Sequence, residues 1–119
     1  MRHRVKNTFK FNHKDGDHRS AVLRNLATSF FIHKSLVTTQ KRARALSIIV
    51  DNLINVVNSK DEMNAIREVE RHVFTKESSL ELFNNIAPKY KDKKCGLTSI
   101  TPIKFRDGDS AKLVKIQLV

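Results

Sequence analysis

The hydrophobic residues follow helical spacing through the first half of the chain. Between residues 18 and 34, apolar side chains recur every three or four positions, which predicts an amphipathic helix with Asp17 as its N-cap. Its apolar stripe comprises Val22, Leu23, Leu26, Ala27, Phe30 and Phe31. Residues 40–57 carry the cleanest stripe and predict a second helix, capped by Thr38 or Thr39. That stripe comprises Leu46, Ile49, Val50, Leu53, Ile54 and Val57.

Two shorter helices are predicted next. Residues 59–74 open with Ser59 and Glu62 at the spacing of a capping box. One face of this segment carries Met63, Ile66, Val69 and Val73. Residues 76–90 predict another helix, which Pro88 is expected to limit because proline lacks a backbone N–H. Its apolar face comprises Leu82, Phe83 and Ile86.

Toward the C-terminus the spacing changes from helical to alternating. Alternating apolar residues stand at Ile103, Phe105, Val114, Ile116 and Leu118. Asp107-Gly108 separates the two runs, which predicts a β-hairpin with this pair in its turn. Pro102 indicates an edge strand or a bulge. The stretch "SLVTT" at 35–39 is either a short third strand or a turn between the first two helices.

These elements predict an α+β fold. About four helices pack with a small mixed sheet, formed by the C-terminal hairpin and the short central strand. An extended basic N-terminal arm over residues 1–17 precedes a single domain over residues 18–119.

The distribution of charge indicates the class of partner. The chain has 23 Lys and Arg against 12 Asp and Glu, a net charge of +11. Residues 1–50 carry +9 of this and residues 51–119 carry +2, and no acid occurs between Asp17 and Asp51. A basic half joined to a nearly neutral half favours a polyanion that binds one end of the molecule. A basic surface kept for solubility is the alternative.

The start of the second predicted helix carries cations where acids are favourable. The unpaired N–H groups of a helix start attract negative charge, yet Lys41, Arg42 and Arg44 stand there. A phosphate from a partner would receive the helix N–H groups, the guanidinium groups and the hydroxyls of Thr38 and Thr39 together. Cations that simply extend into solvent are the alternative.

The opening arm has a composition suited to nucleic acid. The cations of the arm and of the helix start that follows it are Arg2, Arg4, Lys6, Lys10, Lys14 and Arg19. The histidines of the same stretch are His3, His13 and His18. Phe9 and Phe11 either stack on bases or pack on the protein's own domain. Without a polyanion the arm lacks the apolar content to order itself.

Other functional classes lack a sequence signal. Cys95 is alone, and His13 and His18 do not have the spacing of metal ligands, so no metal site and no cofactor are expected. No glycine-rich phosphate loop or nucleophile elbow occurs, so no catalytic residues and no small-molecule substrate are expected. No run is long and apolar enough for a transmembrane helix or a secretory signal, and no membrane partner is expected.

Three function classes remain for comparison. A non-catalytic RNA-binding structural protein explains the basic half, the arm and the cationic helix start. A small DNA-binding protein would use the helices 18–34 and 40–57 as a helix-turn-helix, which needs a short turn between them. A small nuclease or RNA-modifying enzyme would use His18 or His33.

Several stretches resemble one known family along nearly the whole chain. They are "MRHR" (1–4), "HRSAVLRNLATS" (18–29), His33 with Thr38 and Thr39, "KRARAL" (41–46), "LFNNIAPKY" (82–90) and "GLTSITPIKFRDGDSAKLVKIQLV" (96–119). In this order and spacing they are similar to ribosomal protein seventeen of the bacterial large subunit. The chain departs from the family at Leu97 and Ser99, where a Tyr and an Arg are usual.

The resemblance implies a structural, non-catalytic protein that binds and stabilises large-subunit ribosomal RNA near the peptide exit tunnel. It implies a cytoplasmic, ribosome-bound location and contacts with neighbouring large-subunit proteins, numbers twenty-two and thirty-two. The family's RNA contacts concentrate in segments matched here by Arg2, His3, Arg4, His18, Arg19, Arg24, Asn25, Lys41, Arg42 and Arg44.

Overall fold

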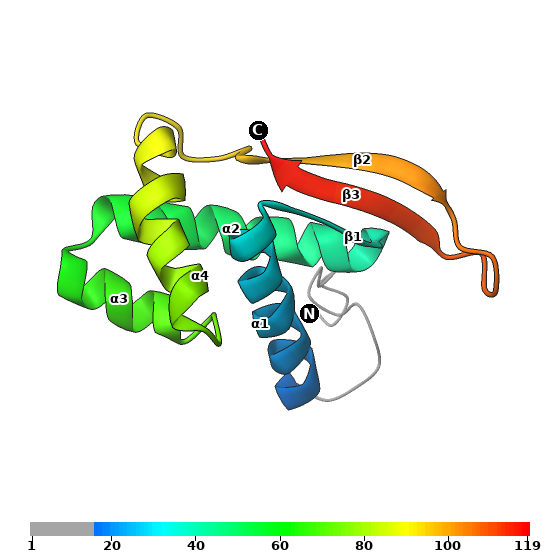
Figure 1. The fold of residues 1–119 in the computed structure, drawn as a ribbon, viewed down its shortest axis with the longest axis horizontal. Helices are drawn as coiled ribbons and strands as arrows, with labels where there is room; N and C mark the ends of the chain where they lie inside the picture. The colour runs from blue at the N-terminus through cyan, green and yellow to red at the C-terminus, as the bar shows by residue number, and fades with distance from the viewer. Residues whose placement is uncertain (1–15) are drawn as a thin grey trace, which may run out of the picture.

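The structure is a computed structural model and describes residues 16–119. The described elements follow the order α1, β1, α2, α3, α4, β2, β3 (Figure 1). Their bounds are α1 Gly16–His33, β1 Ser35–Thr39, α2 Gln40–Ser59, α3 Glu62–Glu70, α4 Lys76–Glu81, β2 Thr98–Phe105 and β3 Lys112–Leu118. The predicted α+β class is confirmed, and "SLVTT" is a strand. The proposed arm lies almost entirely outside the described residues.

The sheet has three strands in the order β1-β3-β2. β3 lies in the middle and runs antiparallel to both neighbours, so the sheet is antiparallel and not mixed as expected. The prediction of a mixed sheet was wrong because the spacing of residues within β1 predicts a strand but does not show which strand it pairs with or in which direction. β2 is an edge strand with a register shift between Pro102 and Lys104, as Pro102 predicted.

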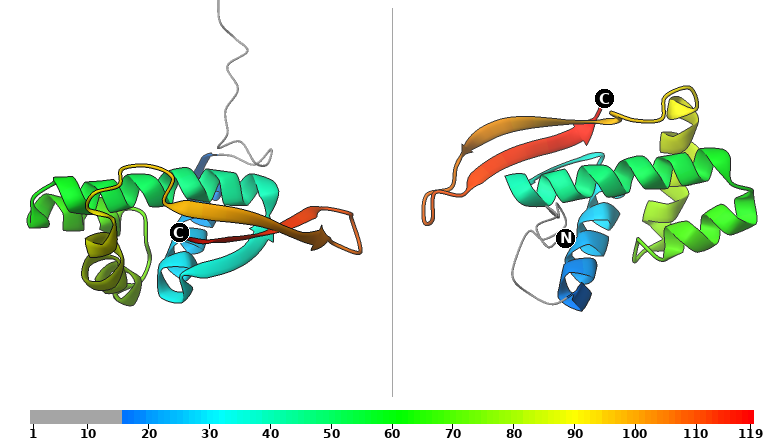
Figure 2. Two further views of the ribbon diagram at one scale, coloured as in Figure 1. Left: turned by 90° about the horizontal axis from the view of Figure 1, so that it is seen from above. Right: turned by 180° about the vertical axis from the view of Figure 1, so that it is seen from behind.

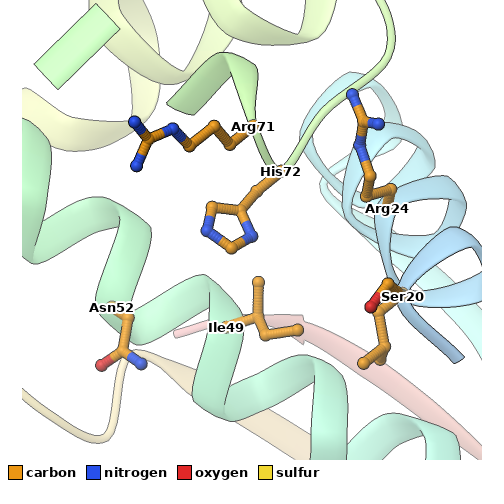
Figure 3. A pocket seen from close by; sticks show the side chains of 7 residues that line it. Ser20, Arg24, Ile49, Asn52, Arg71 and His72 are labelled. Carbon is orange, nitrogen blue, oxygen red and sulfur yellow. The ribbon is translucent and has the colours of Figure 1, made fainter. Parts of the chain in front are cut away.

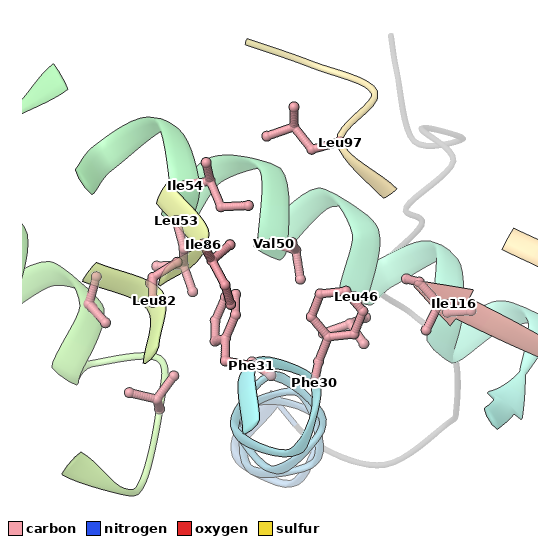
Figure 4. Packing of buried hydrophobic residues seen from close by; sticks show 14 of the residues in the cluster. Phe30, Phe31, Leu46, Val50, Leu53, Ile54, Leu82, Ile86, Leu97 and Ile116 are labelled. Atoms are coloured by element: carbon pink, nitrogen blue, oxygen red, sulfur yellow. The ribbon is translucent and has the colours of Figure 1, made fainter. Parts of the chain in front are cut away.

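One face of the sheet packs on α2, and α1 crosses α2 beside it (Figures 1 and 2). The predicted stripes of both helices supply the core, together with Val114 and Ile116 of β3 (Figure 4). The rings of Phe30 and Phe31 meet edge to face, with centroids 5.9 Å apart. Leu97 is fully buried in this core. Its side chain therefore makes a packing contact within the protein.

Two predicted helix starts are corrected by the structure. Asp17 lies inside the first turn of α1 and does not precede the helix. Ser59 ends α2, where its hydroxyl donates to the carbonyl of Asn55, and Asp61 occupies the N-cap position of α3. The capping box was wrong because the long apolar stripe of α2 extends that helix through Ser59.

The buried face of α3 also differs from the predicted one. Val69 and Val73 are buried as expected, but Met63 is 63% exposed and Ile66 is 37% exposed. Ala65 is buried instead. A small side chain at a helix contact lets the two axes approach closely, and the larger residues then lie at the rim of the contact.

The last predicted helix is shorter and less regular than expected. After α4 the chain forms a π-helical turn over Leu82–Ile86 and a 3₁₀ turn over Ala87–Tyr90, which contains Pro88. Pro88 therefore lies beyond the α-helix that it was expected to limit. Leu82 and Ile86 are buried as predicted, because the wider π turn still directs them toward α2.

Candidate nucleic-acid interface

The first turn of α2 exposes a group of cations. Thr39 stands at the N-cap position in an extended conformation, but its side chain makes no capping hydrogen bond. No acid lies in this first turn, and Lys41, Arg42 and Arg44 are exposed. Thr38 and Thr39 are half-buried beside them. The backbone N–H groups of a helix start, a positive dipole end and three cationic side chains thus share one surface.

The first turns of α1 add further polar groups. His18 is exposed and Arg19 is half-buried within the first turn, and Asn25 is exposed two turns later. In Figure 1, α2 begins beside the end of β1 on the side away from α3, and α1 begins at the lower end of the molecule. Five predicted contact residues of the described chain therefore lie in the first turns of these two helices: His18, Arg19, Lys41, Arg42 and Arg44.

Six predicted contact residues lie outside the described residues. They are Arg2, His3, Arg4, Lys6, Lys10 and Lys14. Their contacts, and the choice between stacking and packing for Phe9 and Phe11, stay predictions.

Arg24 is turned toward the protein itself. Its Nη2 donates to the backbone carbonyl of Glu70 at 3.3 Å and to that of Val73 at 3.2 Å. Its guanidinium carbon lies 4.2 Å from the centroid of the Phe74 ring. The hydroxyl of Thr28, one turn later, accepts from the backbone N–H of Phe74 at 2.9 Å. These contacts tie α1 to the segment between α3 and α4, a role that the sequence did not indicate.

The hollow next to Arg24 has a volume of about 360 Å³. Its lining residues are Ser20, Leu23, Arg24, Ile49, Asn52, Arg71 and His72. In Figure 3 the His72 ring points toward Ile49, while the guanidinium groups of Arg24 and Arg71 extend away on opposite sides. A small-molecule site brings its polar groups together on one ligand, and these groups diverge.

The geometry also bears on the two alternative functional classes, a helix-turn-helix DNA-binding protein and a small nuclease or RNA-modifying enzyme. α1 and α2 are joined by β1, which pairs along its length with β3, so the turn of a helix-turn-helix does not exist here. Lys34 makes the change from helix to strand in a left-handed conformation, with φ of 65°. His18 and His33, named for a nuclease, stand at opposite ends of α1, about 22 Å apart along its axis.

Residues 16–119 show two further features. They hold no group of three or more His, Cys, Asp or Glu side chains placed to bind a metal ion. None of their helices is both long and apolar enough to cross a membrane.

The sheet register brings the C-terminal hairpin to the start of α2. Thr39, the last residue of β1, pairs with Leu113 of β3, and Leu113 pairs with Lys104 of β2. Next to them Lys112 pairs with Phe105. The sequence predicted the hairpin but not its place beside the cations. Only the pairing of β1 with β3 could have revealed it, and alternation alone does not determine which strands pair.

The hairpin loop is fixed by a local ion pair. Arg106 donates to Asp109 through Nε at 2.9 Å and through Nη2 at 2.6 Å. The backbone N–H of Ala111 also donates to Asp109, at 3.2 Å. The hydrogen bond from the Arg106 side chain, followed by that from Ala111, lowers the pKa of Asp109 to about 2. The carboxylate is therefore ionised at neutral pH.

Comparison with known proteins identifies the family. The family model described as ribosomal protein L17 matches residues 22–119. A relative from Desulforudis audaxviator, the large ribosomal subunit protein bL17, is 37% identical over 103 residues, which cover 87% of this chain and 91% of that protein. The bL17 protein of Clostridium kluyveri is 41% identical, with 87% and 90% covered.

A third relative is longer than this chain. The bL17 protein of Geobacter sulfurreducens is 35% identical over 102 residues, which cover 86% of this chain and 58% of the relative. The family match and these identities agree with the order of motifs seen in the sequence. The chain belongs to the ribosomal protein L17 family.

Proposed function

We propose that this protein is a structural constituent of the large ribosomal subunit in the cytoplasm, where it binds and stabilises large-subunit ribosomal RNA. The observation that carries the proposal is the first turn of α2, where three exposed cations surround a helix start that contains no acid. A phosphate group supplies the negative charge that this turn lacks. The relatives, which are named large ribosomal subunit proteins, support the same assignment.

The proposed mechanism is charge neutralisation combined with fit to the shape of the RNA. Lysine and arginine side chains displace counterions from the phosphates, and this gain does not depend on base sequence. The two helix starts and the basic arm approach RNA from different elements, so the protein holds separate RNA segments together. His18, Arg19, Asn25, Thr38 and Thr39 add hydrogen bonds to phosphate or sugar oxygens in this proposal.

The resemblance also supports a position in the subunit. We place the protein near the exit of the peptide tunnel, in contact with large-subunit proteins twenty-two and thirty-two. In this position it needs no catalytic residue, no cofactor and no small-molecule substrate, and its role is to stabilise the folded RNA.

Sedimentation tests the assignment directly. Cell lysate is separated on a sucrose gradient at low salt and millimolar Mg²⁺, and the protein is detected in each fraction. Co-migration with the large subunit is expected, with release into the top fractions as salt is raised because phosphate contacts weaken. Protein that stays in the top fractions at low salt, while the subunits are intact, would refute the proposal.

A further inference from the structure

The β2–β3 hairpin extends past the start of α2 and exposes an aromatic ring there. In Figure 1 the two strands and their loop project beyond the last helix on that side of the molecule. Phe105, at the end of β2, is 65% exposed, and Ile103 is 50% exposed. Neither side chain contributes to the core. An aromatic ring at such a projecting position is accessible to a partner.

The register shows which way the ring faces. Phe105 pairs with Lys112, and residues that pair directly lie on the same face of a sheet. Lys112 alternates with Val114 and Ile116, whose side chains are buried on the side of α2. The ring of Phe105 and the side chain of Lys112 therefore lie on the face that α2 covers, beyond the point where α2 begins.

The same register sets the distance to the helix start. Lys104 and Thr39 are separated by one strand, because both pair with Leu113. Two strand spacings place their backbones about 10 Å apart. Gln40, which follows Thr39, begins α2. A single RNA strand can therefore reach both the cations of the first turn and the end of the hairpin.

Several local hydrogen bonds connect the two sides of the hairpin loop. Besides the two bonds from Arg106 to Asp109, the backbone N–H of Arg106 donates to the carbonyl of Ala111 at 2.7 Å, and that of Ser110 donates to the carbonyl of Arg106 at 2.8 Å. Little conformational entropy remains to be lost in this loop on binding. The guanidinium of Arg106 binds Asp109 of the loop. Lys112 lies on the same face as the ring, and Lys104 lies on the other face of the hairpin.

We propose that Phe105 is a stacking platform for an unpaired base of the RNA whose phosphate binds at the start of α2. Lys112, on the same face of the sheet as the ring, contacts a phosphate next to that base. The inference rests on the proposed function and adds a second, non-ionic contact to it. An RNA strand fits this surface better than a protein does, because Lys112 lies on the face of the ring and the first turn of α2 nearby contains cations and no acid. The base is unpaired because stacking on a side chain needs an open base face.

The test uses the full chain and large-subunit ribosomal RNA freed of protein, with affinity measured by filter binding. Phe105→Leu keeps an apolar side chain on the strand but removes the ring, and Phe105→Tyr keeps the ring. We expect Phe105→Leu to weaken binding about fivefold or more, without changing the slope of log K against log salt. Phe105→Tyr should bind within about twofold of wild type. Met63→Ala, at another exposed apolar residue, is the matched control and should have no effect.

The outcomes separate the inference from the proposed function. Phe105→Leu with wild-type affinity would overturn the stacking platform, even if binding stays steeply salt-dependent. An equal loss in Phe105→Tyr would also overturn it, because the ring would then not be the feature that binds. A wild-type protein without salt-dependent RNA binding would refute the proposed function itself. Replacing Lys112 with Gln should reduce the salt slope by about 0.7–0.9, and an unchanged slope would remove Lys112 from the proposal.

Discussion

The start of α2 differs from the starts of α3 and α4 in the side chains that surround the unpaired backbone N–H groups of the first turn. α3 begins with Asp61 and Glu62, whose charges suit the positive end of a helix. At α4, the Thr75 hydroxyl accepts from the backbone N–H of Ser78, and Glu77 lies in the first turn. α2 has neither a side-chain cap nor an acid, and it adds three cations.

The difference separates helix starts that carry their own acids from one that, in our proposal, binds the phosphate of a partner. α3 and α4 are stabilised by their own side chains. α2 is stabilised by its buried face, since Leu46, Val50, Leu53 and Ile54 are buried in the core. That packing tolerates an unfavourable first turn, which is then available to bind phosphate.

The largest expected effect comes from removing the cations of α2. The triple variant Lys41→Gln, Arg42→Gln, Arg44→Gln should bind ribosomal RNA about 100-fold more weakly at 0.15 M salt, if each phosphate contact contributes about 1 kcal/mol. Its melting temperature should stay the same or rise, because unfavourable charges leave the helix start. Filter binding and thermal denaturation check the two results.

A matched variant controls for net charge. Lys60→Gln, Lys91→Gln and Lys93→Gln removes three exposed cations from the side away from the start of α2. It should lose far less affinity than the triple variant of α2. Equal losses would show that RNA responds to total charge, and the contrast between the helix starts would fail.

Arg24 offers the next largest effect, on stability. Arg24→Gln removes two hydrogen bonds from a charged donor and the contact with Phe74, so unfolding should become easier by about 2 kcal/mol. Asn25→Ala, at the exposed neighbour, should leave stability unchanged within about 0.5 kcal/mol. Urea denaturation measures both. Wild-type stability in Arg24→Gln would contradict the structural role, and a loss of RNA affinity in the folded variant would reveal the additional contact predicted from sequence.

The threonines at two helix starts sharpen the comparison further. Thr75→Ala removes the cap of α4 and should cost about 1 kcal/mol, which lowers the melting temperature by about 4–8 °C. Thr39→Ala removes no capping bond and should change stability by less than about 0.5 kcal/mol. A large loss of stability in Thr39→Ala would mean that α2 is capped after all.

The smallest effect concerns the hairpin loop at low pH. The pKa of Asp109 is lowered from 3.8 to about 2 in the folded protein, so its contribution is fully present above about pH 4 and disappears as pH falls through 2. The pair is on the surface, and the change in stability should be slight. NMR titration of the Asp109 carboxyl group should give the lowered pKa, and Arg106→Gln should raise it toward 3.8. A pKa that does not respond to Arg106→Gln would contradict the ion pair.

The sequence predicted well whatever depends on local spacing. The stripes of α1 and α2 supply most of the core, and Asp107-Gly108 lies in the hairpin loop as expected. The cations of α2 were recognisable because they conflict with a local rule about helix starts. Local conflicts of this kind tend to occur at functional sites.

Whatever depends on long-range contacts could not be read from spacing. Arg24 appeared as one cation among several, because the carbonyl groups of Glu70 and Val73 lie more than forty residues away. Phe105 appeared as a strand residue, because only the order β1-β3-β2 brings it to the start of α2. The predicted buried face of α3 was wrong for a related reason, since the contact with α2 buries Ala65 and leaves the larger Met63 exposed.

The salt dependence of RNA binding tests the contrast between the helix starts most directly. Affinity of the wild-type protein for large-subunit ribosomal RNA is measured from 0.05 to 0.3 M salt, beside the triple variant of α2. For roughly six phosphate contacts the wild-type slope of log K against log salt is expected near −4 to −5. The variant slope should be shallower by about 2–3, one contact for each cation removed. Equal slopes for the two proteins would contradict the proposal that the first turn of α2 binds phosphate.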